Sequence, residues 1–286
     1  MKLKEGAYEN VISRQTAADI RETEAAGLVC KTVEIDSAES TKMLADFLAH
    51  SIMKKLGDKD FSVEEKIGMV NDVLEKTQMS DEDAIEVPRL LSAVISRQRQ
   101  VTLEATATDL VRPRSGFRVS NLFTGGQSEI SLGAEIMRDI ASADNICIIV
   151  SFLRMSGIRM ILEDLKNFCS QPGHTLRVIT TTYCGATEAK AVEHLAALPN
   201  TEIRISYNTK IERLHAKSYI FERNSGFSTA YIGSSNLSRS AQTDGLEWNI
   251  RVTNVENPHI IKSAMATFER YWDSENFEDF RIGGIK

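Results

Sequence analysis

Apolar runs of strand length alternate with helical patterns from residue 129 onward. Apolar residues recur at helical spacing in 129–142, 156–168 and 187–197, and between these segments lie the runs NICIIVSF, LRVITTT and EIRIS. Runs that are apolar throughout and separated by helices are typical of parallel strands covered on both faces. We therefore expect an α/β domain over residues 129–286, with a sheet flanked by helices.

The pattern changes after residue 206. RLHAKSYIFE (213–222) and STAYIGSS (228–235) predict the two strands of a hairpin, because the connecting RNSGF contains a Ser-Gly turn signal. LEWNIRV (246–252) predicts one more strand, so the expected sheet is mixed. A last helix is predicted after the cap Asn257 and Pro258, and its packing stripe consists of Ile261, Met265, Phe268 and Trp272.

Residues 1–105 predict a mainly helical accessory domain. The pairs Asp36 with Glu39 and Ser62 with Glu65 are spaced as helix-start signals, and apolar residues follow each pair at helical spacing. The run LVCKTVEI (28–35) predicts a strand at the edge of this layer.

A linker and surface loop are predicted at 106–128, where Pro and Gly residues interrupt the pattern. The pair Gly125-Gly126 lacks the spacing of a known phosphate-binding loop, so an ordinary loop is the better interpretation.

Composition narrows the class of protein. The 286-residue chain has a net charge of −6, and the acidic excess lies in residues 1–100, with 14 Lys and Arg against 19 Asp and Glu. Such a chain lacks the overall basic footprint of a non-specific DNA-binding protein, so nucleic acid would have to contact a local patch. No apolar run reaches the ~18 residues of a membrane span, so we expect no contact with a membrane. The cysteines are far apart and suggest neither a disulfide framework nor a zinc site, which favours a cytoplasmic protein: Cys30, Cys147, Cys169 and Cys184.

Side chains that can hold a phosphate meet on the predicted hairpin. Successive side chains of a strand point to opposite faces, so His215 and Lys217 project together. A turn near Ser225 places Lys217 opposite Gly233 and brings Asn236 beside both side chains. An imidazole, an ammonium group and an amide around a common point predict a phosphate site.

RLHAKSYIF followed by YIGSSNLS resembles the H-x-K … G-S-x-N signature of the phospholipase D superfamily. The resemblance extends from about residue 131 to 275 and includes SFLRMSGIRMIL, VITTTYCGATEAKA and DGLEWNIRVT, which resemble the phospholipase-D-like nuclease region ahead of bacterial superfamily 2 helicases. The chain has no G-x-x-x-x-G-K-[ST] motor motif of its own. The resemblance therefore implies a nuclease that is either a stand-alone relative or the front piece of a longer protein, with a helicase domain or subunit as partner in the second case.

In this family, a motif histidine attacks phosphorus and forms a phosphohistidine, which water later hydrolyses. The resemblance implies that His215 is this nucleophile or the acid that protonates the leaving group, and that Lys217 and Asn236 hold the non-bridging oxygens. Ser234 matches the motif serine and is expected to assist. No metal ion or other cofactor is expected, because the lysines and histidines supply the positive charge.

Further candidates are less tied to the motif. Ser235 offers a second hydroxyl beside Ser234, and Arg154 and Thr182 follow apolar strands, beyond whose carboxyl ends ligands collect in open sheets. Arg154 is expected to contact the phosphate, although an ordinary surface position fits it equally well.

Two acidic positions bear on the resemblance. Glu222 stands where the family has Asp, a position that we interpret as mostly structural. Glu247 resembles the downstream glutamate that, in single-motif members, accepts a hydrogen bond from the catalytic histidine and fixes its tautomer. The alternative for Glu247 is an ordinary exposed strand carboxylate.

A single motif supplies one histidine, whereas the family's complete site uses two. The simplest source of the second is an identical chain across a two-fold axis, so we expect a homodimer with both His215 side chains at its centre.

Three functions compete. The leading hypothesis is a metal-independent nuclease that cleaves DNA. A phospholipase-type or other phosphodiester hydrolase shares the chemistry, but the chain has neither a basic amphipathic helix nor a second motif. A catalytically degenerate assembly module of a helicase system is disfavoured by the intact His215, Lys217 and Asn236.

Overall fold

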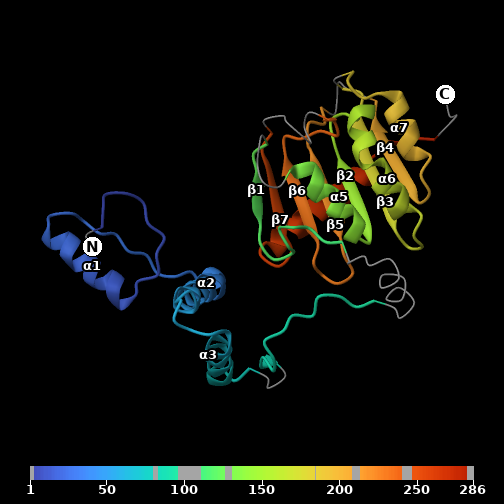
Figure 1. The fold of residues 1–286 in the computed structure, drawn as a ribbon. Helices are drawn as coiled ribbons and strands as arrows, with labels where there is room; N and C mark the ends of the chain where they lie inside the picture. The colour runs from blue at the N-terminus through green and yellow to red at the C-terminus, as the bar shows by residue number, and fades with distance from the viewer. Residues whose placement is uncertain are drawn as a thin grey trace. The chain divides into compact units, whose positions relative to one another are not determined.

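The computed structural model describes residues 3–79, 83–95, 111–125, 131–183, 185–207, 213–239 and 247–281 (Figure 1). The chain divides into two compact units, residues 1–96 and 97–286. The first unit thus ends before the boundary at residue 105 that the sequence predicted. Gly126 and Cys184 lie outside the described residues.

Three capped helices make up the regular structure of the N-terminal unit: α1 (Arg14–Ala25), α2 (Ser37–Leu56) and α3 (Val63–Lys76). The Asp36 side chain accepts a hydrogen bond from the backbone N–H of Ala38 at the start of α2. Ser62 and Glu65 form a reciprocal capping box at the start of α3. Both predicted helix starts are confirmed, because each short polar side chain satisfies an N–H group that the first helical turn leaves unpaired.

The predicted strand at residues 28–35 is wrong. These residues form no ladder, and Leu28, Val29, Val33 and Ile35 are all exposed. An isolated strand has nothing to pair with its backbone groups, and the described residues of this unit contain no second strand. The β-branched pattern of these residues alone was therefore insufficient to predict a strand.

The C-terminal unit is built on an eight-stranded mixed sheet with the order β1-β7-β6-β5-β2-β3-β4-β8. β2, β3 and β4 are parallel, and the remaining neighbours pair antiparallel. The strands are β1 (Asn121–Phe123), β2 (Asn145–Ile149), β3 (Thr175–Thr181), β4 (Thr201–Ser206), β5 (Ser218–Glu222), β6 (Thr229–Gly233), β7 (Asn249–Thr253) and β8 (Glu278–Asp279).

Helices cover both faces of this sheet. Alternate residues of β2 separate into two cores: Ile146 and Ile148 join the core with α5 (Leu132–Ser142), α6 (Met155–Cys169) and α7 (Ala189–Ala196). Cys147 and Ile149 join the core with α9 (Pro258–Trp272). Figure 1 shows α5, α6 and α7 together in front of the sheet. The α/β fold class and the mixed sheet with flanking helices are thereby confirmed.

The predicted packing residues lie where the periodicity placed them. Ile261, Phe268 and Trp272 of α9 are buried, and Met265 packs beside them partly buried. Cys147 is fully buried as expected, and burial raises the pKa of its thiol to about 12.

Two expectations about element boundaries need correction. The predicted strand 213–222 is regular only from Ser218, and residues 213–217 lead into it without forming a ladder. The stretch 106–128, expected to be linker, contains β1, which pairs with β7 as an edge strand of the sheet. Arg114 and Ser115 of this stretch donate their backbone N–H groups to the buried Glu135 carboxylate of α5.

A buried polar cluster ties α5 to the hairpin. The Asp139 carboxylate is fully buried and accepts hydrogen bonds from Arg223 (2.6 Å), Thr229 (2.9 Å), Tyr231 (2.6 Å) and Arg251 (3.4 Å). Removing one partner of such a cluster leaves an uncompensated buried charge, which typically costs about 3–5 kcal/mol. The cluster therefore fixes β5, β6 and β7 against α5.

Across the described ranges, no helix is both long enough and apolar enough to cross a lipid bilayer.

Candidate active site

The motif residues gather at one end of the sheet, because the strand register brings their loops together. Ile149 at the end of β2 pairs with Ser218 at the start of β5, and Ser218 pairs with Ile232 near the end of β6. Gly233 in turn pairs with Asn249 at the start of β7. The segments that follow β2, β3, β4 and β6 and precede β5 and β7 therefore emerge at the same sheet end, which we call the site end.

His215 and Lys217 meet directly at the site end. The Lys217 Nζ lies 2.9 Å from the His215 Nδ1 and donates to the His215 backbone oxygen at 2.7 Å. Lys217 is buried, while His215 is exposed. An ammonium group can only donate, so Nδ1 is the acceptor in this contact and a neutral ring carries its proton on Nε2.

Asn236 is oriented by the strand end next to it. Its buried side-chain oxygen Oδ1 accepts hydrogen bonds from the backbone N–H groups of Ser151 (3.0 Å) and Phe152 (3.2 Å), just beyond β2. With the oxygen occupied in this way, the amide nitrogen Nδ2 is the end of the group that can donate to a ligand.

Ser234 and Glu247 form a second pair at the site end. The Ser234 hydroxyl donates to the Glu247 carboxylate and accepts a 3.0 Å hydrogen bond from the Trp248 backbone N–H. Ser234 is exposed and Glu247 is half-buried. The contact that the structure gives for Glu247 is thus with the motif serine rather than with His215.

Ser235 is held in the interior. It is fully buried, its hydroxyl accepts a 2.7 Å hydrogen bond from the Asn249 amide, and its backbone oxygen accepts one from the Tyr219 hydroxyl at 3.0 Å. Burial raises the pKa of Tyr219, so this phenol stays a donor. The arrangement favours a positioning role for Ser235 over a phosphate contact.

Two glycines allow the motif loop to approach its neighbours. A Cβ on Gly157 of α6 would overlap the backbone of Leu237 and Ser238, and a Cβ on Gly233 would overlap the Trp248 carbonyl oxygen. Leu237 also forms a parallel bridge with Leu153. Residues 234–238 are therefore clamped between the start of α6 and the start of β7.

The solved structures that resemble this chain have low sequence identity to it. NucT from Helicobacter pylori and Nuc, a phospholipase D family member from Salmonella typhimurium, are each 18% identical, with TM-scores of 0.44 and 0.40; each match covers 57% of this chain and 99% of the other. TrmBL2, an archaeal chromatin protein, is 13% identical over 93% of this chain and 82% of its own, with a TM-score of 0.39. No curated protein sequence matches.

A family model matches the part of the chain that carries the site. Residues 136–272, which contain every motif residue described above, match the model "Cardiolipin synthase, PLD-like domain". This domain belongs to the phospholipase D superfamily. Members of the superfamily are phosphodiester hydrolases, and nucleases are among them.

The position of the superfamily's motif Asp lies away from the site end. Glu222 is the last residue of β5, five residues beyond Lys217, which corresponds to roughly 16 Å along a strand. It lies near Arg177 and Glu269, and burial is the main cause that raises the pKa of its carboxyl group. A location away from the site end agrees with the expectation that the motif Asp position is mostly structural.

Arg154 and Thr182 both lie at the site end, but their contacts differ. Arg154 is exposed at the N-cap of α6, and its guanidinium carbon lies 5.6 Å from the centre of the Phe152 ring. Thr182 follows β3 and donates its backbone N–H to the Ser206 backbone oxygen at 3.1 Å. The exposed Arg154 guanidinium group can therefore contact an anion. The Thr182 backbone N–H is instead used in a hydrogen bond to the end of β4.

Sequence reasoning missed the residues that position the motif. Asn249, Tyr219 and Ser151 carry no motif signal, because each acts only through one or two hydrogen bonds to the loop. One signal was available for Asn249: strand alternation in EWNIRV puts it on the opposite face from the exposed Trp248 and Ile250. A buried amide there requires a polar partner.

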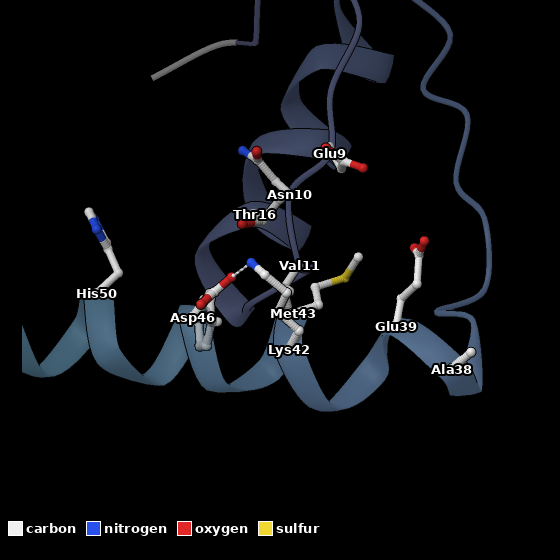
Figure 2. A pocket seen from close by; sticks show the side chains of 11 residues that line it. Glu9, Asn10, Val11, Thr16, Ala38, Glu39, Lys42, Met43, Asp46 and His50 are labelled. Atoms are coloured by element: carbon white, nitrogen blue, oxygen red, sulfur yellow. Dashed lines mark hydrogen bonds and ion pairs between the residues drawn. The ribbon is translucent and has the colours of Figure 1, made fainter. Parts of the chain in front are cut away.

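A separate hollow of about 700 Å³ lies in the N-terminal unit beside α2 (Figure 2). Its lining includes the carboxylates of Glu9, Glu39 and Asp46, and its one lysine, Lys42, is already paired with Asp46 at 2.6 Å. The acidic lining disfavours an anionic ligand. The hollow contains none of the motif residues, so the site end remains the candidate active site.

Proposed function

We propose that this protein is a nuclease that cleaves phosphodiester bonds in DNA without a metal ion, through a phosphohistidine intermediate, at an active site shared by two chains. The observation that carries the proposal is the contact of Lys217 Nζ with His215 Nδ1, 2.9 Å apart, at the sheet end where Asn236 is held. Imidazole, ammonium and amide donors at one place suit the charge of a phosphoryl group in transfer.

The mechanism that we propose uses two histidines. His215 Nε2 of one chain attacks phosphorus while the bond to the leaving oxygen breaks, and His215 of the partner subunit, which starts as an imidazolium, gives its Nε2 proton to that oxygen and becomes neutral. Water then attacks phosphorus, passes its proton to the same nitrogen of the partner, and the P–N bond breaks. Both histidines end in their starting protonation states.

Lys217 is proposed to change partner when the phosphate enters. Because its ammonium group contacts His215 Nδ1, the unprotonated nitrogen of the neutral ring faces Lys217 rather than the substrate. An anion that attracts the ammonium leaves Nδ1 free to take the ring proton from Nε2 by exchange through water, and the Nδ1–H group can then donate a hydrogen bond to Glu247. His215 Nε2 then carries the lone pair that attack requires.

Asn236 and Ser234 are proposed to contact the non-bridging oxygens beside Lys217. Asn236 supplies Nδ2 because its Oδ1 is occupied by Ser151 and Phe152. Ser234 is exposed and can turn its hydroxyl from Glu247 to the ligand. Arg154, exposed at the same sheet end, is proposed to hold a neighbouring phosphate of the strand.

The N-terminal unit is proposed to recruit the helicase partner that the sequence resemblance implies. Thr23 is its only buried residue among those described, while α2 leaves Leu44, Phe47 and Leu48 exposed. An unpacked apolar stripe of this kind suits contact with another protein.

The test is cleavage of labelled single- and double-stranded DNA by the purified chain in EDTA, beside two variants. His215→Ala should lose ~10³-fold or more of the rate, as expected when the group that forms the covalent intermediate is removed. His259→Ala, an exposed histidine in the first turn of α9, is the control and should keep full activity. Strict dependence on magnesium, or a fully active His215→Ala chain, would refute the mechanism. Preferential hydrolysis of lipid headgroups would instead favour a phospholipase.

A further inference from the structure

Exposed aromatic side chains lie at the sheet end that carries the candidate active site. Trp248 is 66% exposed, Tyr207 48% and Tyr183 37%. They precede β7, follow β4 and follow β3, so all three lie at the site end. In the described part of this unit, the other exposed aromatic side chain is Phe227, in the β5–β6 turn at the opposite end. Large apolar groups left in water at one place mark a binding surface.

The backbone of Trp248 is fixed against the motif serine. Its N–H donates to Ser234 Oγ at 3.0 Å, and its backbone oxygen accepts from the Ser234 N–H at 3.0 Å. The residue is thereby held between Glu247 and the buried Asn249, while its indole remains in solvent. The ring is consequently presented beside the group that we propose to contact the scissile phosphate.

Arginines accompany the rings. The Arg213 guanidinium carbon lies 6.0 Å from the centre of the Tyr183 ring, and that of Arg154 lies 5.6 Å from the Phe152 ring. Arg154, Arg213 and Arg239 are exposed at the same sheet end. Flat guanidinium groups and aromatic rings both stack on nucleobases, and the arginines also attract phosphates.

We propose that Trp248, with Tyr183 and Tyr207, stacks on unpaired bases that flank the scissile phosphate, so that the substrate is single-stranded nucleic acid. The inference rests on the proposed nuclease function and adds its substrate class. Bases in a duplex are stacked on one another and cannot receive a side-chain ring, whereas a single strand exposes both faces of each base. A lipid headgroup offers no such partner.

The experiment measures binding, so that it does not depend on cleavage. Fluorescence anisotropy would compare a labelled single-stranded oligonucleotide, an abasic oligonucleotide of the same length and a duplex. Trp248→Ala should weaken binding to the normal strand by about 5- to 100-fold and leave binding to the abasic strand unchanged, because only the former loses a stacked base. Trp248→Phe should restore most of the affinity. Phe227→Ala, at the opposite sheet end, should bind both strands like the wild type.

Separate outcomes decide the inference and the function it rests on. Equal effects of Trp248→Ala on the normal and abasic strands, or wild-type affinity for duplex equal to that for single strands, would overturn the inference. Trp248-dependent binding of phosphatidylglycerol vesicles without any oligonucleotide binding would also overturn it. If Trp248→Ala acts as expected but no phosphodiester is cleaved, the base-stacking surface stands and the nuclease proposal fails.

Discussion

At the residue scale, Asn236 divides two tasks between the two ends of one amide. Its oxygen accepts hydrogen bonds from the backbone N–H groups of Ser151 and Phe152, which anchors the motif loop to the end of β2. Its nitrogen is the end proposed to donate to the phosphate. The structural and catalytic contributions of this side chain can therefore be separated by changing one end only.

Asn236→Asp is the substitution that does so. A carboxylate keeps an acceptor for the two backbone N–H groups, so the unfolding temperature should stay near that of the wild type. The donor is lost and a negative charge faces the phosphate, so the cleavage rate should fall by about 10²-fold or more. Thermal unfolding and single-turnover cleavage of the same preparations test both halves. An active Asn236→Asp chain would show that Nδ2 does not contact the substrate.

Glu222→Ala is the control for this prediction. Although Glu222 occupies the motif Asp position, it lies at the far end of β5, beside Arg177 and Glu269. Its removal should leave the cleavage rate within about twofold of the wild type, since surface and remote changes rarely alter a site.

The sequence alone was sufficient to predict the motif residues but not the residues that hold them in position. His215, Lys217 and Gly233 could be aligned because strand alternation and hairpin register are fixed by backbone geometry, and the structure pairs Gly233 N–H with the Lys217 oxygen at 3.2 Å. Asn249 and Ser151 could not be assigned, because their contacts depend on how three strand ends meet. Which strand ends lie next to each other follows from the strand order of the sheet rather than from the local sequence pattern.

At the element scale, the motif loop 234–238 takes its course from β7 and α6. Just beyond the ladder between β5 and β6, the Gly233 N–H still donates to the Lys217 backbone oxygen, after which the Ser234 N–H donates to the Trp248 backbone oxygen instead. Residues 213–216 consequently pair with no strand in the described part of the chain, which explains why the predicted strand 213–222 was too long. A sequence pattern predicts where a strand fits, and pairing decides how far it extends.

Gly157→Ala tests the close approach of α6 to this loop. A Cβ would overlap the backbone of Leu237 and Ser238, so the loop that carries Asn236 must shift. The cleavage rate should fall by about 10²-fold, because a misplacement of about 1 Å has that effect on a positioned site.

Gly68→Ala is the matched control. Gly68 lies within α3 with open space around its Cα, so this variant should keep full activity and gain about 0.5–1 kcal/mol of local helix stability. Wild-type activity of Gly157→Ala, measured by single-turnover cleavage, would indicate that the loop tolerates displacement.

At the scale of the whole molecule, the two units differ in what holds them together. The sheet domain has a core on each face and a buried charged cluster around Asp139. The N-terminal unit has well-capped helices whose apolar side chains remain largely exposed. Helix caps depend on neighbouring residues and were therefore predictable from the sequence. The apolar residues of a helix do not by themselves indicate which surface packs against them.

The count of histidines sets the last prediction, the homodimer. Each chain offers one His-x-Lys pair, and the mechanism needs both a nucleophile and a leaving-group acid. His194 is exposed on α7 and contacts the Lys190 backbone oxygen, and His174 packs against the Phe168 ring, so neither is placed as a second catalytic group. A second copy of the chain is the source that supplies an equivalent imidazole with its own Lys217.

Mixing chains tests this directly. Wild-type chains would be allowed to exchange with a threefold excess of His215→Ala chains, which leaves about one-sixteenth of randomly formed dimers fully wild type. Activity per wild-type chain should then fall to about a quarter, because a mixed dimer has only one of the two imidazoles. An equal excess of Glu222→Ala chains, which keep the motif, should cause no such loss. Activity that follows dilution alone, or a chain that sediments as a monomer while it cleaves, would refute the shared site.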